Sequence, residues 1–362
     1  MSIPRMPRRE RSKFFLWAAR VKDKTRQRYR KAVNDFITWC DENNIEAERT
    51  RDLDWALSEY MHDEYERNDG RGRSHAAYVI SGLQLFVPLF RGKLRLSAEA
   101  LKGWTRMHPG RRHPPLTWSL AVAIAAQLAR WGRFEMAVGT LLAFVSLLRI
   151  GELTSVRVGD FLDANSDDSR VDEVRVSGLR LRKTKTADNL FAEIHHEDVL
   201  TLLRRVVSHK HRSEKIFAFS AGSFRQWFKK AVSALHLDDR YVPHSLRHGG
   251  ATLLYMAKVP IETILHRGRW ASTKSARYYV QSGEAMLLAQ SVNSTSRDFG
   301  RTVAADLVGT LLRFHRLNRH PVHAPRADVG SRASPAVASR HSTRQDWQVR
   351  PDYATLDDWS GS

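Results

Sequence analysis

Apolar residues recur every three or four positions through much of the first hundred residues. One such stripe begins near Lys24 and includes Tyr29, Val33, Phe36 and Cys40, a spacing that places these side chains on one face of a helix. Two shorter stripes follow, separated by a basic turn sequence. The first part therefore reads as an all-helical unit with basic outer surfaces. Its predicted helices cover 24–40, 53–65 and 77–85.

The segment HPGRRHPPLT, residues 108–117, interrupts this pattern. Three prolines and a glycine disfavour a continuous helix there, so we place a linker between two domains at this segment. Helical periodicity returns after it, and the segment 134–147 is apolar almost all round, which is typical of a buried helix. The predicted helices of the second part cover 118–131, 134–147, 198–208, 223–235, 243–257, 261–267 and 272–281.

Residues 174–194 follow a different pattern, in which apolar and polar residues alternate on either side of a turn sequence at 186–189. This pattern predicts a β-hairpin, so the expected fold class is mainly α with a small β-hairpin or sheet (α+β). After about Arg301 the apolar density falls, apart from LVGTLLRF near 307–314, which predicts a mostly disordered tail. The predicted organisation is a basic arm over 1–19, a helical domain over 20–107, the linker over 108–117, a second domain over 118–295 and the tail over 296–362.

The 362-residue chain carries a formal net charge of +20. Such a surplus costs self-repulsion unless an acidic polymer neutralises it, so nucleic acid is the expected partner. The single cysteine, Cys40, excludes an internal disulfide and disfavours a thiolate metal site, so we expect a reducing, intracellular environment and no metal. No apolar run approaches the roughly 18 residues that a membrane span needs. Candidate contacts to DNA phosphates in the first part are Arg26, Arg28, Arg30, Lys31, Arg71 and Arg73.

Several polar residues with potential chemistry lie at regular intervals in the second part. In PHSLRHGGAT, residues 243–252, His244 and Arg247 are three positions apart and therefore share a helix face. Upstream, LLRIGEL places Arg149 three residues before Glu152. Downstream, the sequence GRW is followed after nine residues by a tyrosine in SARYYV, and the predicted hairpin carries the basic turn LRKTKTADN.

These residue types suit cleavage of a phosphodiester. The guanidinium groups of Arg149 and Arg247 could hold the non-bridging oxygens in a bidentate geometry. A tyrosine hydroxyl, with a pKa of about 10, needs activation, and His244 could act as its base. Lys185 on the hairpin could protonate the leaving 5′ oxygen. The indole N–H of Trp270 could add a hydrogen bond to the phosphate.

In this order and spacing, LLRIGEL, TKT, HSLRHGGAT, GRW and the following tyrosine resemble the tyrosine recombinase (phage integrase) family over roughly residues 20–290. The GGAT and GRW variants are similar to recombinases of eukaryotic mobile elements. The family often has histidine at Trp270, so the tryptophan removes a titratable donor. Lys183 and Tyr278 remain alternatives to Lys185 and Tyr279. The resemblance places the catalytic residues on Arg149, Lys185, His244, Arg247, Trp270 and Tyr279, with Glu152 and His248 in supporting positions.

The resemblance also implies a fold and an activity. It implies a helical core-binding domain, a catalytic domain, and strand exchange through a covalent 3′-phosphotyrosyl intermediate that needs no cofactor. The expected partners are double-stranded DNA and further copies of the chain, as a tetramer on two DNA sites, without a membrane. The segment 284–292 could reach a neighbouring copy or pack on its own domain. Two alternatives stay open: a DNA-binding protein that keeps the fold without strand exchange, and, less favoured, a type IB topoisomerase.

Overall fold

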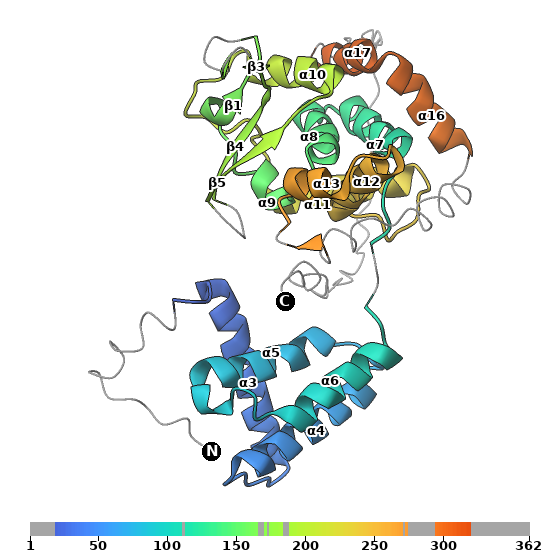
Figure 1. Ribbon diagram of the computed structural model, residues 1–362. Coiled ribbons are helices and arrows are strands. Elements are labelled where there is room, and N and C mark those ends of the chain that lie inside the picture. Colours follow the sequence, from blue (N-terminus) through green and yellow to red (C-terminus); the bar gives the residue numbers. More distant parts are fainter. Residues whose placement is uncertain are drawn as a thin grey trace, which may run out of the picture. The chain divides into compact units, whose positions relative to one another are not determined.

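The computed structural model describes residues 19–110, 113–165, 170–171, 174–183, 188–270, 272–273 and 294–319. The chain divides into two compact units, with the division after Gly110 (Figure 1). The predicted arm over 1–19 lies outside the described residues except for its last position. Most of the predicted helix over 272–281, the segment 284–292 and the tail beyond 319 also lie outside them.

The described part of the first unit is helical. It contains α3 (Asp23–Glu42), α4 (Thr50–Arg67), α5 (Arg73–Phe86) and α6 (Arg95–Met107), with a 3-10 turn at Pro88–Phe90. The three predicted apolar stripes form the buried faces of α3, α4 and α5. Gly82 allows α5 to approach α3 closely, because an added Cβ would lie 2.7 Å from the Val33 side chain and 3.0 Å from the Tyr29 carbonyl oxygen.

The second unit combines helices with a small antiparallel sheet, so the predicted α+β fold class is confirmed. In Figure 1, α7 and α8 lie in the middle of this unit, with the sheet to one side of α8. The α8 helix is buried along its whole length, as predicted from its apolar sequence. The helices are α7 (Trp118–Arg130), α8 (Phe134–Val145), α9 (Ile150–Leu153), α10 (Glu197–Val207), α11 (Ala221–Ala234), α12 (Pro243–Met256), α13 (Ile261–Gly268), α16 (Ser294–Ala305) and α17 (Leu307–Arg319).

The sheet differs in detail from the predicted hairpin. Its strands β1 (Phe161–Leu162), β4 (Gly178–Lys183) and β5 (Asp188–Glu193) are antiparallel in the order β1-β4-β5. The short strand β1 was not predicted, because two residues are too few to show an alternating pattern. The predicted hairpin began at 174, but Val174–Arg175 form a separate strand, β3, that pairs with β2 (Arg170–Val171).

The prediction of disorder after residue 295 is wrong for the first part of that segment, because α16 and α17 fold onto the second unit. Val303, Leu307 and Leu311 are at most 3% exposed. Val303 lies on α16, whereas Leu307 and Leu311 lie on α17, so each helix buries its own apolar face. The partly buried residues that pack beside them are Phe299, Ala304, Val308, Leu312 and Phe314. Gly300 is in close contact with α7, since an added Cβ would lie 1.9 Å from the Ser119 carbonyl oxygen. Within the described part of the chain, none of the helices combines the length and apolar character that crossing a bilayer requires.

Candidate active site

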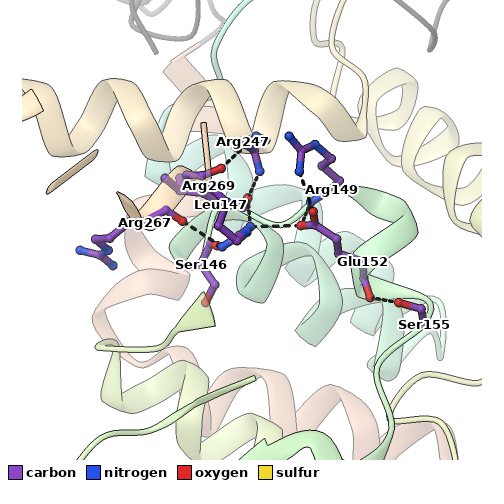
Figure 2. A network of polar contacts seen from close by, with 9 residues as sticks. Ser146, Leu147, Arg149, Glu152, Ser155, Arg247, Arg267 and Arg269 are labelled. Atoms are coloured by element: carbon purple, nitrogen blue, oxygen red, sulfur yellow. Dashed lines mark hydrogen bonds and ion pairs between the residues drawn. The ribbon is translucent and has the colours of Figure 1, made fainter. Parts of the chain in front are cut away.

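The candidate site is built on the C-terminal end of α8. The last carbonyl groups of a helix have no partner within the helix and carry partial negative charge. Leu147, just beyond α8, has a left-handed backbone conformation with φ 50°. Its carbonyl oxygen accepts hydrogen bonds from Arg247 and, at 2.7 Å, from Arg269 (Figure 2). The end of this helix therefore holds positively charged side chains beside it.

Arg149 is the N-cap residue of the short helix α9. Its backbone N–H donates to Glu152 Oε2 at 2.9 Å, and its Nη1 donates to Glu152 Oε1 at 2.7 Å. One carboxylate therefore fixes both the backbone and the guanidinium group of Arg149. The Arg149 side chain is 19% exposed, whereas that of Glu152 is 4% exposed, so an anion from solvent can reach Arg149.

The charge of Glu152 is set by its surroundings. Burial by itself would raise the pKa of the Glu152 carboxyl group. The charges of Arg269 and Arg247, the backbone N–H of Arg149 and its guanidinium group outweigh that effect, so the pKa lies below its ordinary value. Glu152 is therefore ionised at neutral pH. Three arginines share this single negative charge, and the cluster keeps a positive charge that suits an anion.

The two glycines in HSLRHGGAT bring α12 close to α8 and to the segment that precedes α7. An added Cβ at Gly249 would lie 2.0 Å from the Leu116 carbonyl oxygen, and one at Gly250 would lie 2.2 Å from the Phe144 carbonyl oxygen. Both distances are too short for any side chain. Glycine at these positions therefore allows the close approach that places Arg247 at the end of α8.

Arg247 is fully buried and is held by the main chain. Its guanidinium group donates to the carbonyl oxygens of Leu147 and Gly268. It also lies over the Trp270 ring, with 4.5 Å between Cζ and the ring centroid, a cation–π arrangement. Figure 2 shows the guanidinium groups of Arg149 and Arg247 next to each other. The structure therefore brings the two guanidinium groups together at one place, and their roles in binding a phosphate stay predictions.

The two histidines of α12 are uncharged in the protein alone. The rings of His244 and His248 are 5.0 Å apart. Burial, followed by the charges of Arg247, His113 and Arg149, lowers the pKa of His244 to about 3. Burial is also the main cause that lowers the pKa of His248 to about 2. A group with so low a pKa is a weak base, so His244 suits a hydrogen-bonding role unless a bound phosphate raises its pKa.

The structure brings together six of the predicted residues: Arg149, Glu152, His244, Arg247, His248 and Trp270. The predicted nucleophile Tyr279 and the predicted general acid Lys185 lie outside the described residues. Their alternative Tyr278 also lies outside them, and of Lys183 only the backbone, at the end of β4, is described. The roles of these four residues stay predictions.

Sequence reasoning missed Arg269, although it lies inside the GRW motif. Its side chain is 3% exposed, and it contacts Glu152 Oε2 at 3.1 Å. A basic residue next to a conspicuous tryptophan was the available signal, but its partners Leu147 and Glu152 are more than a hundred positions away in the sequence. No local pattern indicates contacts over such a separation.

The six predicted phosphate contacts of the first unit divide into two groups. The helices α3 and α5 run antiparallel, because His75 near the start of α5 pairs with Asp35 at 3.3 Å, whereas Gly82 lies against Tyr29. The two groups therefore lie toward opposite ends of α5. Their role in binding stays a prediction. The first group is Arg26, Arg28, Arg30 and Lys31 on α3, and the second is Arg71 and Arg73 at the start of α5.

An open basic groove along α11 was not identified from the sequence. Next to it, the Trp227 ring has Arg133 Cζ at 4.3 Å and Lys230 Nζ at 4.7 Å from its centroid. Cationic side chains along one helix face suit the phosphate backbone of a nucleic acid. The groove is lined by Arg225, Gln226, Lys229, Lys230 and Ser233.

Among the described residues, no group of His, Cys, Asp and Glu side chains could hold a metal ion.

Comparison with known proteins connects this site to a family. The model of the phage integrase family matches residues 126–286, a range that includes Arg149, Glu152, Arg247 and Trp270. A search of curated protein sequences found no match.

Similar solved structures come from DNA recombinases. A lambda integrase fragment (residues 75–356), a dimer bound to a COC′ core site, is 18% identical, covers 75% of this chain and 94% of its own, and has a TM-score of 0.51. This match shows the fold. The Tn1549 transposon integrase in complex with circular intermediate DNA is 16% identical over 73% of this chain and 98% of its own, with a TM-score of 0.46. XerA recombinase is 15% identical over 81% of this chain and 95% of its own, with a TM-score of 0.36.

Proposed function

We propose that this chain, whose residues 126–286 match the model of the phage integrase family, is a site-specific tyrosine recombinase that cleaves and rejoins DNA strands. The observation that carries the proposal is the pair of neighbouring guanidinium groups of Arg149 and Arg247 at the end of α8 (Figure 2). The Arg149 fork is accessible to a non-bridging oxygen of a phosphodiester, and the buried charge of Arg247 beside it helps to stabilise the charge that develops on these oxygens during attack.

The proposed reaction is a phosphoryl transfer through the protein. The Tyr279 hydroxyl gives its proton to His244, whose pKa a bound phosphate raises, as the Tyr279 oxygen forms a bond to phosphorus. The bond from phosphorus to the 5′ oxygen breaks, and Lys185 gives its proton to that oxygen. The product is a 3′-phosphotyrosyl ester. A 5′ hydroxyl from a partner duplex then gives its proton to Lys185, attacks the ester and releases the tyrosine, which takes its proton back from His244. Because the ester retains the energy of the broken bond, the two steps need no ATP.

The arrangement of Trp270 supports the same site. Its ring lies against the Arg247 guanidinium group at 4.5 Å and packs with a small apolar cluster that includes Leu147 and Ile264. The ring thereby forms a wall that holds Arg247 in place. Trp270 does not titrate near neutral pH, so in this chain the family position that is often histidine contributes packing and an indole N–H donor.

Binding to duplex DNA follows from the charge and the surfaces. The formal charge of +20, the groove along α11 and the basic residues of α3 supply sites for phosphate groups. The lambda integrase fragment with the matching fold is a dimer on its core site. We infer that this protein also acts as an assembly of several copies, and that four copies on two DNA sites exchange strands.

Trapping the covalent ester tests the proposal. Duplexes that the protein binds are selected from a randomised library, and a nick is then placed beside each phosphate in turn so that the short cleaved strand diffuses away. A DNA-linked protein on a denaturing gel that disappears in Tyr279→Phe supports the proposal, with Tyr278→Phe as the matched control. Salt-sensitive binding without an adduct from any duplex would instead support a DNA-binding protein without strand exchange.

Holliday junctions separate the two enzymatic possibilities. A recombinase that pairs two sites accumulates four-way junctions when the second exchange is blocked, whereas a topoisomerase only nicks and reseals one duplex. If Tyr278→Phe abolished the adduct and Tyr279→Phe did not, the nucleophile would be Tyr278.

A further inference from the structure

Arg269 is a buried arginine in an unusual position. It follows the last residue of α13 and has a left-handed backbone conformation, with φ 55°. Residues other than glycine, asparagine and aspartate are uncommon in this conformation, and a buried guanidinium group is expensive unless it is fully hydrogen-bonded. With a side chain only 3% exposed, Arg269 lacks the access to contact DNA directly. Its role must lie in what it holds within the protein.

The guanidinium group of Arg269 joins three parts of the site. Its Nη2 donates to the Leu147 carbonyl oxygen at 2.7 Å and to Glu152 Oε2 at 3.1 Å. Its Nη1 donates to the Arg267 carbonyl oxygen at 2.8 Å and, more weakly, to that of Ser146 at 3.4 Å. One planar fork therefore ties the end of α8 and the end of α13 to the carboxylate of α9 (Figure 2). A lysine has a single cationic point and could not make this set of contacts at once.

The two oxygens of Glu152 are divided between the arginines. Oε1 accepts from Arg149 Nη1, and Oε2 accepts from the Arg149 backbone N–H and from Arg269. Arg269 therefore fixes the carboxylate from the protein interior, and the carboxylate fixes Arg149 on the accessible side. Removal of Arg269 would leave Glu152 with its contacts to Arg149, whose side chain can move together with the carboxylate, and without the contact that holds it from the protein interior.

We propose that Arg269 is a positioning residue for DNA cleavage, which holds Glu152 in the orientation that aligns the Arg149 guanidinium group with the scissile phosphate. This inference rests on the proposed function, and it assigns a role to the central residue of GRW. Arg269 acts through Glu152 and does not touch the substrate.

The charges around Glu152 predict a distinctive pH dependence of DNA cleavage in variants of Arg269. The groups that face its carboxylate are Arg149 on its own helix, Arg247 on α12 and Arg269 after α13. Arg269 contributes the largest of the effects that lower the pKa of Glu152 against its burial. Without Arg269 the pKa of Glu152 rises, so a falling pH protonates Glu152 and releases Arg149. Cleavage should then decline more steeply toward acidic pH in the variant than in the wild type.

The test compares Arg269→Gln and Arg269→Lys with Arg267→Gln in the full chain. Arg267 is a matched control, because it is an arginine two positions away whose side chain donates to the Val145 carbonyl oxygen at 3.4 Å. Its backbone carbonyl, which accepts a hydrogen bond from Arg269, is kept in Arg267→Gln. The measurements are the single-turnover rate of adduct formation on a nicked duplex from pH 5.5 to 8, affinity for the same duplex, and melting temperature. Because a misplacement of about 1 Å costs about 100-fold in rate, we expect a loss of that order in Arg269→Gln, at little change in affinity.

A double-mutant cycle separates positioning from structural support. If Arg269 acts through Glu152, the rate lost in Arg269→Lys should be largely absent when Glu152→Gln is already present, because contacting residues are not additive. The inference would be overturned if the two substitutions reduced the rate of adduct formation independently, so that their fold-losses multiplied. It would also be overturned if the loss of rate in the Arg269 variants did not change with pH and followed only the fraction of folded protein. Should Arg269→Gln fail to fold, the cycle with Arg269→Lys still decides. Absence of an adduct in the wild type would overturn the proposed function itself, whereas a normal adduct in both Arg269 variants would overturn only this inference.

Discussion

Replacing Gly250 with alanine tests whether the close approach of α12 to α8 sets the position of Arg247. The added Cβ would lie 2.2 Å from the Phe144 carbonyl oxygen and 2.6 Å from Leu147 Cδ2. The first contact is to backbone, which cannot rotate away as a side chain can. Because comfortable carbon contacts need about 3.5 Å, α12 must move by about 1 Å.

The expected cost follows from two opposing effects. Overpacking costs about 1–3 kcal/mol, and contact with a backbone oxygen favours the upper end. Alanine recovers about 1 kcal/mol of helix propensity relative to glycine. The net loss of about 2 kcal/mol lowers the melting temperature of a unit of this size by about 4–8 °C. Arg247 lies three residues away on the same helix, so its displacement should slow adduct formation by about 100-fold.

The assay measures the melting temperature by fluorescence. The rate of adduct formation is measured at a temperature well below the melting temperatures of both the wild type and Gly250→Ala. Gly103→Ala in α6 is the control, because no atom lies within 4 Å of its added Cβ, and we expect a small gain in stability and an unchanged rate. A Gly250→Ala variant that melts early yet cleaves at the wild-type rate would show that Arg247 does not depend on this contact. A variant that matches the wild type in both measurements would refute the packing argument as well.

Three further predictions concern other parts of the second unit. Gly300→Leu should lower the melting temperature by at least as much as Gly250→Ala, because its Cβ would meet the Ser119 oxygen at 1.9 Å and force α16 off α7; an unchanged transition would contradict this packing. Lys229→Gln in the α11 groove should weaken DNA binding and reduce its salt slope by about 1, and a slope equal to that of the wild type would remove Lys229 from the interface. Because the pKa values of His244 and His248 fall to about 3 and about 2 in the folded protein, the unfolded chain takes up protons first, so the free energy of unfolding should fall progressively below pH ~6.5. The fall should be smaller in His248→Gln, and an equal fall in both proteins would exclude His248 as its source.

Features that depend on neighbouring positions were predictable from the sequence. Arg149 and Glu152 are three residues apart, so a helix start brings them together wherever that helix lies. The buried α8 and the pair of strands β4 and β5 follow from equally local patterns. In contrast, Arg269 bonds to Glu152 across 117 positions, and no spacing in the sequence indicates that contact. The prediction failed at the C-terminal helices for a different reason, because their apolar residues are divided between two short helices and are interspersed with polar and basic residues.

The location of the site at the end of α8 has a physical consequence for its charge. Anion sites commonly use the positive N-terminus of a helix, whereas here a C-terminus points its carbonyl groups at the site. These carbonyls would repel a phosphate directly, but they bind the guanidinium groups of Arg247 and Arg269. The buried arginines therefore reverse the sign of the helix end, and the accessible positive group beside them is Arg149, whose side chain is 19% exposed. This arrangement requires buried donors that bond several carbonyls at once and keep their charge, a condition that arginine meets and lysine does not.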